Sequence, residues 1–550
     1  MHRSDKKLED LHLDRLQISQ GLDYEPEKAA LDGTRVEVMS EIHAWINGAS
    51  DDLLDSRAFL LLGQAGVGKS AIAHRVAQEL KHLERLGAFF RFSSSKRVDS
   101  EHFFRTIARR IADLDPAYAA TLMAYTDSTL NSTPSPARQL KELLTKPFET
   151  LSALGTLVIV VDALDECPEG SRDELIQCLH DNITSFPKNI RFVITSRPSE
   201  AENLHKCPWV YTHDLKANAL TDSDIYMFVK SRLGDIVTKE LPRGFDRPQL
   251  DAIVKSAQGV FQYAAVVCNE INSARKRRRE PLPRVYARLM EDGSQGLDSL
   301  YLAILNAAFP ASTTSLDVPG SSELQEFHLV MGWVLHSQAP LSRHVLQSFA
   351  AAQVYEEEEE SFVEPDEGDD EYGLVASVLH PLGALLSGTD SSKSPVSPLH
   401  SSFRDFLTEK SRSGHFHIGP ASGHHMNLAV TCLRIMEQEL HFNMASLESS
   451  YVLNSDVPNF AQRIEAGVSK TLSYACLHWI WHLKMSAVSE QEFKEMDLIH
   501  NFLDNLFLFW FEALGLIAQA AKAENNLMTL KNWSQVNVCL LPLSNTKSDY

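Results

Sequence analysis

A glycine-rich stretch of eight residues, Gly63-Gln64-Ala65-Gly66-Val67-Gly68-Lys69-Ser70, constrains the fold of this chain more than any other sequence feature. It matches the phosphate-binding pattern GxxxxGK[ST]. In that pattern glycines let the backbone curl so that N–H groups face a phosphate, the lysine reaches the β and γ oxygens, and the serine hydroxyl ligates Mg²⁺. The helix that follows, beginning around Ala71, presents its positive end to the anion. The motif predicts a nucleotide site at residues 63–71, with Ser70 as a metal ligand.

The sequence on both sides of the motif has the context that such a site requires. Residues 58–62 form a short apolar run typical of a strand, and Ile72, Val76 and Leu80 lie on one face of a helix. Strand, loop and helix in this order favour a phosphate-binding loop. A glycine-rich turn that binds nothing is the alternative.

Four short apolar runs alternate with longer amphipathic segments in this part of the chain, at residues 58–62, 88–92, 157–161 and 191–195. Runs this apolar suit strands that are covered on both faces, as in a parallel sheet with crossover helices. The predicted fold is therefore α/β, a parallel sheet with helices on both faces. After about residue 216 the strand-like runs disappear, and apolar residues three and four apart predict helices at 222–233, 248–271 and 297–308.

The third apolar run leads into three carboxylates, Asp162, Asp165 and Glu166. A buried strand delivers Asp162 to its carboxyl end, where phosphate-loop enzymes place a carboxylate that orients Mg²⁺. Asp165 and Glu166 follow where a carboxylate can polarise an attacking water. An ordinary acidic turn is the alternative, but the glycine-rich motif favours the functional interpretation.

The fourth apolar run ends in Thr195-Ser196-Arg197. Positive charge beside the transferred phosphoryl group stabilises the transition state of phosphoryl transfer and is the main source of catalysis. Arg197 is therefore predicted to sense or neutralise the γ-phosphate. The alternative is a surface arginine in a salt bridge.

Together these motifs resemble those of NACHT-type STAND ATPases, the switch modules of NLR-like proteins. They are most similar to fungal NACHT proteins, whose NTPase resembles the nephrocystin 3 N-terminal module. The similarity rests on GQAGVGKS at 63–70, VIVVDALDE at 158–166 and FVITSRP at 192–198, with weaker matches at Gly33-Thr34-Arg35 and at LHSSFRDFL, 399–407. The resemblance implies ATP or ADP with Mg²⁺ as ligands, slow hydrolysis, homo-oligomerisation on activation and signal transduction in innate immunity.

The resemblance also implies an order of domains along the chain. We expect an N-terminal helix and linker at 1–35, the P-loop NTPase core at 36–215, an all-α helical domain at 216–310, a winged-helix domain at 311–412 and a C-terminal helical arm at 413–550. His400 falls on the winged-helix histidine of the family, which implies contact with the β-phosphate of ADP; a purely structural histidine is the alternative. Gly259-Val260-Phe261 departs from the Gly-x-Pro of the family, which leaves the adenine contact open.

We expect a signalling switch in which ADP holds a closed state through Lys69, Ser70 and His400, and ATP exchange opens it. Two alternatives stay open. One is a constitutive P-loop ATPase, which steady turnover without an activating ligand would favour. The other is an interaction scaffold with a degenerate NTPase.

Charge and apolar patterning restrict partners and location. The chain carries 52 Lys and Arg against 73 Asp and Glu, a net charge of −21, which argues against binding nucleic acid by bulk charge. Eleven of the carboxylates lie at 355–371, predicted to be a disordered acidic insert. The N-terminus lacks the apolar run of a signal peptide, and Leu506–Ala518 is too short for a membrane span and is interrupted by Glu512. A buried helix is predicted there, in a cytoplasmic protein.

Four further patterns are interpreted as structural or accidental. The guanine-type motif TKxD at 546–549 lies far from the glycine-rich motif, and the basic run at 275–279 reads as the solvated end of a helix. His478 and His482 have the spacing of a zinc-protease helix, but Trp479 replaces its glutamate. The histidines at 415, 417, 424 and 425 are assigned to a solvated loop.

Overall fold

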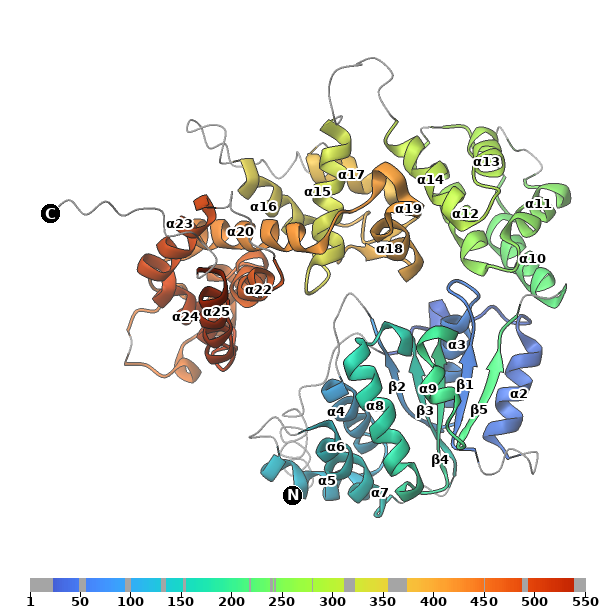
Figure 1. The fold of residues 1–550 in the computed structure, drawn as a ribbon, viewed down its shortest axis with the longest axis horizontal. Helices are drawn as coiled ribbons and strands as arrows, with labels where there is room; N and C mark the ends of the chain where they lie inside the picture. Colours follow the sequence, from blue (N-terminus) through green and yellow to red (C-terminus); the bar gives the residue numbers. More distant parts are fainter. Residues whose placement is uncertain are drawn as a thin grey trace. The chain divides into compact units, whose positions relative to one another are not determined.

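The computed structural model describes residues 23–48, 56–93, 100–129, 135–151, 155–216, 219–237, 241, 244–278, 280–310, 322–354, 373–449, 451–486 and 493–538. The chain divides into two compact units (Figure 1). The first comprises Met1–Ala303 together with the short segment His400–Ser402, and the second comprises Ile304–Leu399 and Phe403–Tyr550. The predicted acidic insert at 355–371 and the TKxD match at 546–549 lie outside the described residues.

The described part of the first unit is built on a five-stranded sheet in the order β2-β3-β4-β1-β5. Every pairing in this sheet is parallel. Its strands are β1 (Ala58–Leu62), β2 (Leu86–Arg91), β3 (Leu157–Asp162), β4 (Ile190–Ser196) and β5 (Val210–Asp214). The four predicted strands are confirmed, whereas β5 was not predicted, because its side chains are half-buried or exposed and form no continuous apolar run.

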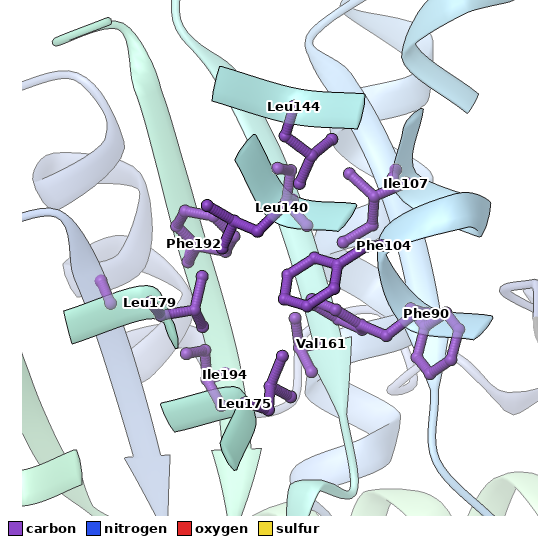
Figure 2. Packing of buried hydrophobic residues seen from close by; sticks show 14 of the residues in the cluster. Phe90, Phe104, Ile107, Leu140, Leu144, Val161, Leu175, Leu179, Phe192 and Ile194 are labelled. Carbon is purple, nitrogen blue, oxygen red and sulfur yellow. The ribbon is translucent and has the colours of Figure 1, made fainter. Parts of the chain in front are cut away.

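Side chains of the sheet alternate between two apolar layers, because successive residues of a strand point to opposite faces. On one face Phe59 and Leu61 of β1 pack with the buried sides of α2 (Val36–Ile46) and α3 (Lys69–His82). On the other face Leu60 packs in a layer that includes Phe90, Phe104, Val161 and Phe192 (Figure 2). The predicted cover of helices on both faces is confirmed.

The second apolar layer is covered by helices that lie between β2 and β5 in the sequence. They are α4 (Ser100–Ala112), α5 (Pro116–Thr129), α6 (Pro136–Gln139), a π-helical turn at Leu140–Thr145, α7 (Lys146–Phe148), α8 (Glu169–Asn182) and α9 (Glu202–His205). Helices thus cover both faces of the sheet, and the polar side chains described below lie at the carboxyl ends of its strands.

The rest of the first unit is helical, as predicted. It contains α10 (Ala219–Leu233), α11 (Arg247–Ala257), α12 (Phe261–Arg277), α13 (Leu282–Glu291) and the start of α14 (Leu297–Ala308). The single helix predicted over residues 248–271 is wrong. It is broken at Gln258 and Gly259, which both have positive φ angles, 48° and 81°, and this left-handed backbone ends α11.

The second unit is almost entirely helical in its described residues. Its elements are α15 (Ser322–His336), α16 (Arg343–Val354), α17 (Leu374–Leu379), the antiparallel pair β6 (Leu386–Ser387) and β7 (Ser397–Pro398), α18 (Ser401–Thr408), α19 (Lys410–Ser413), α20 (Ala421–Glu439), α21 (Phe460–Gly467), α22 (Lys470–Met485), α23 (Phe493–Asn501), α24 (Phe507–Leu516) and α25 (Lys522–Val538). Its core includes the fully buried Trp333, Trp479 and Trp510. The winged-helix and arm assignments stay predictions.

The apolar run near residue 510 forms a helix, α24, with one face buried. Trp510 and Leu514 are buried, whereas Leu508 is 74% exposed and Phe511 is 49% exposed. The prediction of a buried helix is thus correct for one face only. None of the described helices is long and apolar enough to cross a membrane.

Candidate functional site

The glycine-rich loop connects β1 to α3 at the carboxyl edge of the sheet. Gly66 and Gly68 have φ angles of 80° and 100°, a left-handed backbone that glycine adopts without a steric penalty. Space is also limited, because a Cβ atom on Gly66 would lie 2.7 Å from the Cβ of Gln262. The backbone N–H of Gln262 donates to the Gly66 carbonyl over 2.9 Å. β1 and α3 therefore hold the two ends of the loop, which includes Gln64, Ala65 and Val67. The start of α12 holds its middle at Gly66.

Lys69 is the first residue of α3 and its side chain is folded back over the loop. Its ammonium group donates to the carbonyls of Gly63, at 2.7 Å, and Gln64, at 3.0 Å. Burial lowers the pKa of Lys69, and the carboxylates of Asp165, Asp162 and Glu166 oppose that change. These three acids therefore lie close enough to act on the lysine. Ser70 and Ala71 occupy the first turn of α3.

Asp162 ends β3 and is completely buried. Its Oδ1 accepts a hydrogen bond from the Thr195 hydroxyl over 2.6 Å, and the Thr195 oxygen accepts one from the backbone N–H of Ala163 over 2.9 Å. Its Oδ2 has no hydrogen-bond partner in the described part of the chain. A buried carboxylate oxygen that accepts no hydrogen bond is suited to bind a hard cation. This oxygen and the Ser70 hydroxyl are ligands of the type that Mg²⁺ prefers.

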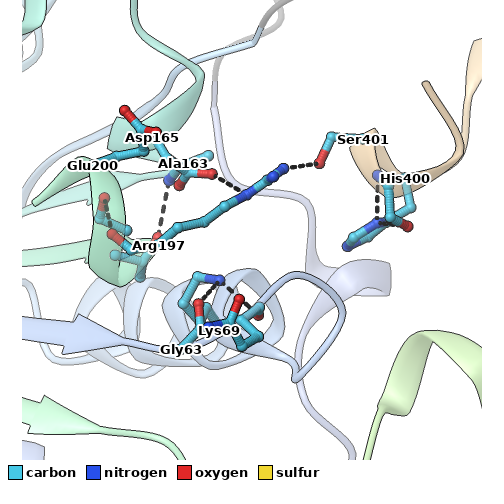
Figure 3. Close-up of polar contacts among 12 residues, drawn as sticks. Gly63, Lys69, Ala163, Asp165, Arg197, Glu200, His400 and Ser401 are labelled. Carbon is cyan, nitrogen blue, oxygen red and sulfur yellow. Dashed lines mark hydrogen bonds and ion pairs between the residues drawn. The ribbon is translucent and has the colours of Figure 1, made fainter. Parts of the chain in front are cut away.

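Arg197 and Asp165 form an ion pair beside this carboxylate (Figure 3). The Nε atom of Arg197 lies 2.8 Å from Oδ2 of Asp165, and its Nη2 lies 3.5 Å from the hydroxyl of Ser401. Burial raises the pKa of Asp165, while Lys69 and Arg197 oppose that change. Glu166 follows in the same short turn, Leu164–Glu166. Arg197 is therefore an ion-pairing residue as well as a cation placed at the carboxyl edge of the sheet.

His400 belongs to the first unit, although it is distant from the loop in sequence. Its Nδ1 accepts a hydrogen bond from the backbone N–H of Ser402 over 3.1 Å, which leaves the proton of the neutral ring on Nε2. Burial lowers the pKa of His400 to about 4, and the positive charges of Arg91, Lys69 and Arg197 act in the same direction. His400 is thus a neutral imidazole near Lys69, with an N–H group available to donate.

Arg35 attaches the N-terminal segment to the loop. Its guanidinium donates to the Val67 carbonyl over 2.7 Å and lies 4.8 Å from the centre of the Phe261 ring. Its backbone N–H donates to the carboxylate of Asp224 in α10 over 3.1 Å. The motif Gly33-Thr34-Arg35 and the segment that departs from Gly-x-Pro, Gly259–Phe261, are therefore brought to the same side of the loop.

Three residues around Asp162 were not singled out from the sequence. Arg91, at the end of β2, has its Nε atom 3.7 Å from Oδ2 of Asp162. Thr195 supplies the hydrogen bond to Oδ1, and His74 of α3 is fully buried, with its Nδ1 accepting the backbone N–H of Glu25 over 2.9 Å. The polar residues that end the apolar runs at Arg91 and Thr195 were the available signal, because parallel strands end at one edge.

The discounted patterns fall elsewhere, with one correction. His424 and His425 lie in α20, and His425 is buried, so their assignment to a solvated loop is wrong. No group of three or more His, Cys, Asp or Glu side chains among the described residues is arranged to hold a metal ion. Arg275 and Lys276 are exposed at the end of α12, as predicted.

Comparison with known proteins supports the interpretation of the first unit. Residues 36–197 match the family described as nephrocystin 3, N-terminal. The vegetative incompatibility protein HET-E-1 of Podospora anserina is 23% identical over 511 residues, which cover 87% of this chain and 34% of that protein. The chain thus spans about a third of the length of this curated relative.

Two solved structures are similar at low TM-scores. One is a STAND protein with a tetratricopeptide repeat sensor from Pyrococcus horikoshii, with a TM-score of 0.35 and 12% identity over 93% of this chain and 66% of that chain. The other is Cdc6p of Pyrobaculum aerophilum, with a TM-score of 0.30 and 12% identity over 66% of this chain and 92% of that chain.

The parallel sheet and its glycine-rich loop define the first unit as a P-loop NTPase fold. Within that class, residues 36–197 match the nephrocystin 3 N-terminal family, and the chain is similar to the vegetative incompatibility protein HET-E-1.

Proposed function

We propose that this chain is an ATP/ADP-binding signalling switch of the NLR type. The observation that carries the proposal is that Lys69, Asp162, Asp165, Arg197 and His400, which come from four separate stretches of sequence, lie together in the first unit. A loop that binds nothing would have no need of two buried carboxylates and a buried lysine.

The residues of the site have distinct proposed roles. Backbone N–H groups of residues 63–71 surround the phosphates, and Lys69 exchanges its two carbonyl partners for phosphate oxygens. Ser70 and Asp162 hold Mg²⁺, which when bound offsets charge on the phosphates. Asp165 and Glu166 orient a water molecule, and Arg197 stabilises charge on the γ-phosphate.

The proposed closed state depends on His400. The neutral ring already carries its proton on Nε2 and can donate it to a phosphate oxygen without first being protonated, and the bond between Arg197 and Ser401 holds the same segment. ADP would stabilise this arrangement, and ATP would shift the population away from it, since a ligand acts only through its differential affinity for two states. Slow hydrolysis, oligomerisation on opening and a cytoplasmic location belong to the same proposal.

The two rivals predict different behaviour of purified protein. A constitutive ATPase turns over steadily and retains no nucleotide, whereas a scaffold with a degenerate site binds none.

The test is nucleotide binding by Lys69→Ala with Lys81→Ala as the matched control. Both lysines lie on α3, but Lys81 is exposed and distant from the loop in sequence. We expect Lys69→Ala to weaken ADP and ATP binding at least about a hundredfold, since charge-assisted phosphate contacts are strong, and Lys81→Ala to leave it unchanged. Mass spectrometry of nucleotide released from the wild type should detect ADP. Unchanged affinity in Lys69→Ala would refute the site.

A further inference from the structure

Arg91 lies directly beside the metal-orienting carboxylate of the proposed site. It is the last residue of β2 and is paired in register with Asp162 at the end of β3. Residues in register on neighbouring strands have side chains on the same face of the sheet. The Nε atom of Arg91 is accordingly 3.7 Å from Oδ2 of Asp162.

The two charged groups lie within ion-pair distance, but these two atoms make no hydrogen bond. Neither Oδ2 of Asp162 nor Nε of Arg91 has a hydrogen-bond partner in the described part of the chain. A separation of 3.7 Å is too long for a hydrogen bond and short enough for a strong Coulomb interaction. Arg91 therefore balances the buried charge of Asp162 while leaving Oδ2 free to accept a closer ligand.

The positive charge of Arg91 also acts on other ionisable groups near Asp162. Burial is the main cause that lowers the pKa of His74 on α3 and that of His400, and the guanidinium of Arg91 acts in the same direction on both, so it lies near both rings. For Glu25 in the N-terminal segment, burial raises the pKa, Lys28 lowers it, and Arg91 adds a smaller effect in the same direction as Lys28. The arginine is thus placed between the carboxylate and the groups that surround it.

We propose that Arg91 is a positioning residue that serves as the resident cation of Asp162 when no metal ion is present, and so sets how strongly nucleotide binding depends on Mg²⁺. This inference rests on the proposed nucleotide-binding function. Its physical basis is that Arg91 and Mg²⁺ face one carboxylate oxygen and repel each other. The arginine adds positive charge for a metal-free nucleotide and lowers the affinity for the metal complex.

Removal of the charge should therefore change the two affinities in opposite directions. Without Arg91, metal-free ADP loses a nearby positive charge and binds more weakly, whereas Mg²⁺ with ADP loses a competitor and binds more tightly. The ratio of the ADP dissociation constant in excess EDTA to that in excess Mg²⁺ should rise about tenfold or more in a partly buried site.

The experiment is calorimetric titration of ADP into the full chain, in EDTA and in Mg²⁺, for wild type and four variants. Arg91→Gln and Arg91→Met remove the charge, Arg91→Lys keeps it, and Arg138→Gln is the control. Arg138 is an exposed arginine in an ion pair with Glu142, and its side chain is 53% exposed. We expect the ratio to rise in both neutral variants and to keep its wild-type value in Arg91→Lys and Arg138→Gln.

The outcomes separate this inference from the function on which it rests. If wild-type protein binds ADP under neither condition, the proposed function fails. If wild type binds ADP through Lys69 but the neutral variants keep the wild-type ratio, only the role of Arg91 is overturned. Unfolding of both neutral variants, measured by circular dichroism, would show that the arginine is structural and would also overturn it.

Discussion

Ala163 has an unusual backbone for a residue with a side chain. Its φ and ψ angles are 57° and 48°, in the left-handed region, where a Cβ atom costs about 1 kcal/mol. The bend turns the chain sharply after β3, so that Asp162 and Asp165 both remain at the carboxyl edge of the sheet. Its N–H donates to Thr195, which also donates to Asp162. One hydroxyl thus fixes the bend and the buried carboxylate together.

Replacement of Thr195 by valine tests this arrangement. Valine has nearly the same shape but leaves the Asp162 carboxylate and the Ala163 N–H without their partner, which should cost about 1–3 kcal/mol of stability. Thr212→Val is the control, because the Thr212 hydroxyl bonds His205 at an exposed position. Urea unfolding measures both, and an equal loss in the two variants would contradict the assigned role of Thr195.

At the scale of whole elements, the sequence predicted the buried strands well and the partly exposed strand poorly. β1 has the predicted bounds because five consecutive apolar residues are covered on both faces. β5 could not be recognised, since Val210–Asp214 lies at the edge of the sheet and alternates too weakly. The break between α11 and α12 was missed because a helical pattern continues through Gln258, whose left-handed backbone is set by its surroundings.

The candidate site was predictable only where a motif spans consecutive residues. Lys69 and Asp162 follow from their own local patterns. The contact between Arg91 and Asp162 depends instead on β2 and β3 being neighbours in the sheet, although 65 residues or more separate them in sequence. Local spacing carries no information about that pairing, so Arg91 and His74 appeared as ordinary residues of a strand and a helix.

The glycine-rich loop provides a prediction at the scale of an element. In Gly66→Ala the new Cβ would lie 2.7 Å from the Cβ of Gln262 and 3.1 Å from Val260, in a backbone with φ of 80°. The loop must therefore shift, which should lower stability by about 2 kcal/mol and abolish nucleotide binding. Gly170→Ala is the control, since a Cβ on that residue of α8 meets no atom within 4 Å; it should be neutral or stabilising. Normal ADP binding by Gly66→Ala would refute the predicted geometry.

A chain of hydrogen bonds between buried side chains links α20 and α22 in the second unit. The hydroxyl oxygen of Tyr474 accepts the N–H of Gln338 over 3.0 Å and lies 2.9 Å from Nε2 of His482, to which the hydroxyl can donate its own proton. The proton of His482 is then on Nδ1, which donates to Nδ1 of His425 over 3.1 Å. This order requires both rings to be neutral. Further histidines face the chain: His478 contacts Tyr474, and His336 stacks on His424 and contacts His425.

The second unit should therefore lose stability in mild acid. Burial lowers the pKa of His478 from 6.5 to about 4, and Lys522 acts in the same direction. Burial also lowers the pKa of His424. The unfolded chain binds more protons than the folded chain between these values, so the stability present above pH 6.5 declines as the pH falls towards 4. The free energy of unfolding from urea titrations, measured at several pH values, gives the slope.

Two variants test whether His478 contributes to this dependence of stability on pH. His478→Gln should flatten it, whereas His500→Gln, at an exposed position of α23, should leave it unchanged. A slope that is identical in wild type and in both variants would show that other groups titrate.

The whole molecule combines two units with separate cores and different chemistry. The first holds the phosphate-binding loop and His400, and the second holds the histidine chain. The net charge of −21 is also unevenly distributed, since 11 carboxylates lie at 355–371 and the rest of the chain carries −21 + 11 = −10. A nucleotide is therefore expected to act on the first unit, whereas acid should act on both, since burial lowers the pKa of His400 and His74 in the first unit and of His478 in the second.

Thermal unfolding of the full chain tests this separation. ADP at a concentration about 100 times its dissociation constant should stabilise the unit that binds it by about 2.7 kcal/mol, and should raise the midpoint of one transition only. Lowering the pH from 7 towards 5 should lower the midpoints of both transitions, because His400 and His74 of the first unit and His478 of the second must become charged. Calorimetry with Lys69→Ala assigns the first transition, since the variant should remove its response to ADP and leave the response to pH intact. A single transition that shifts with both ADP and pH would show instead that the two units unfold as one cooperative structure.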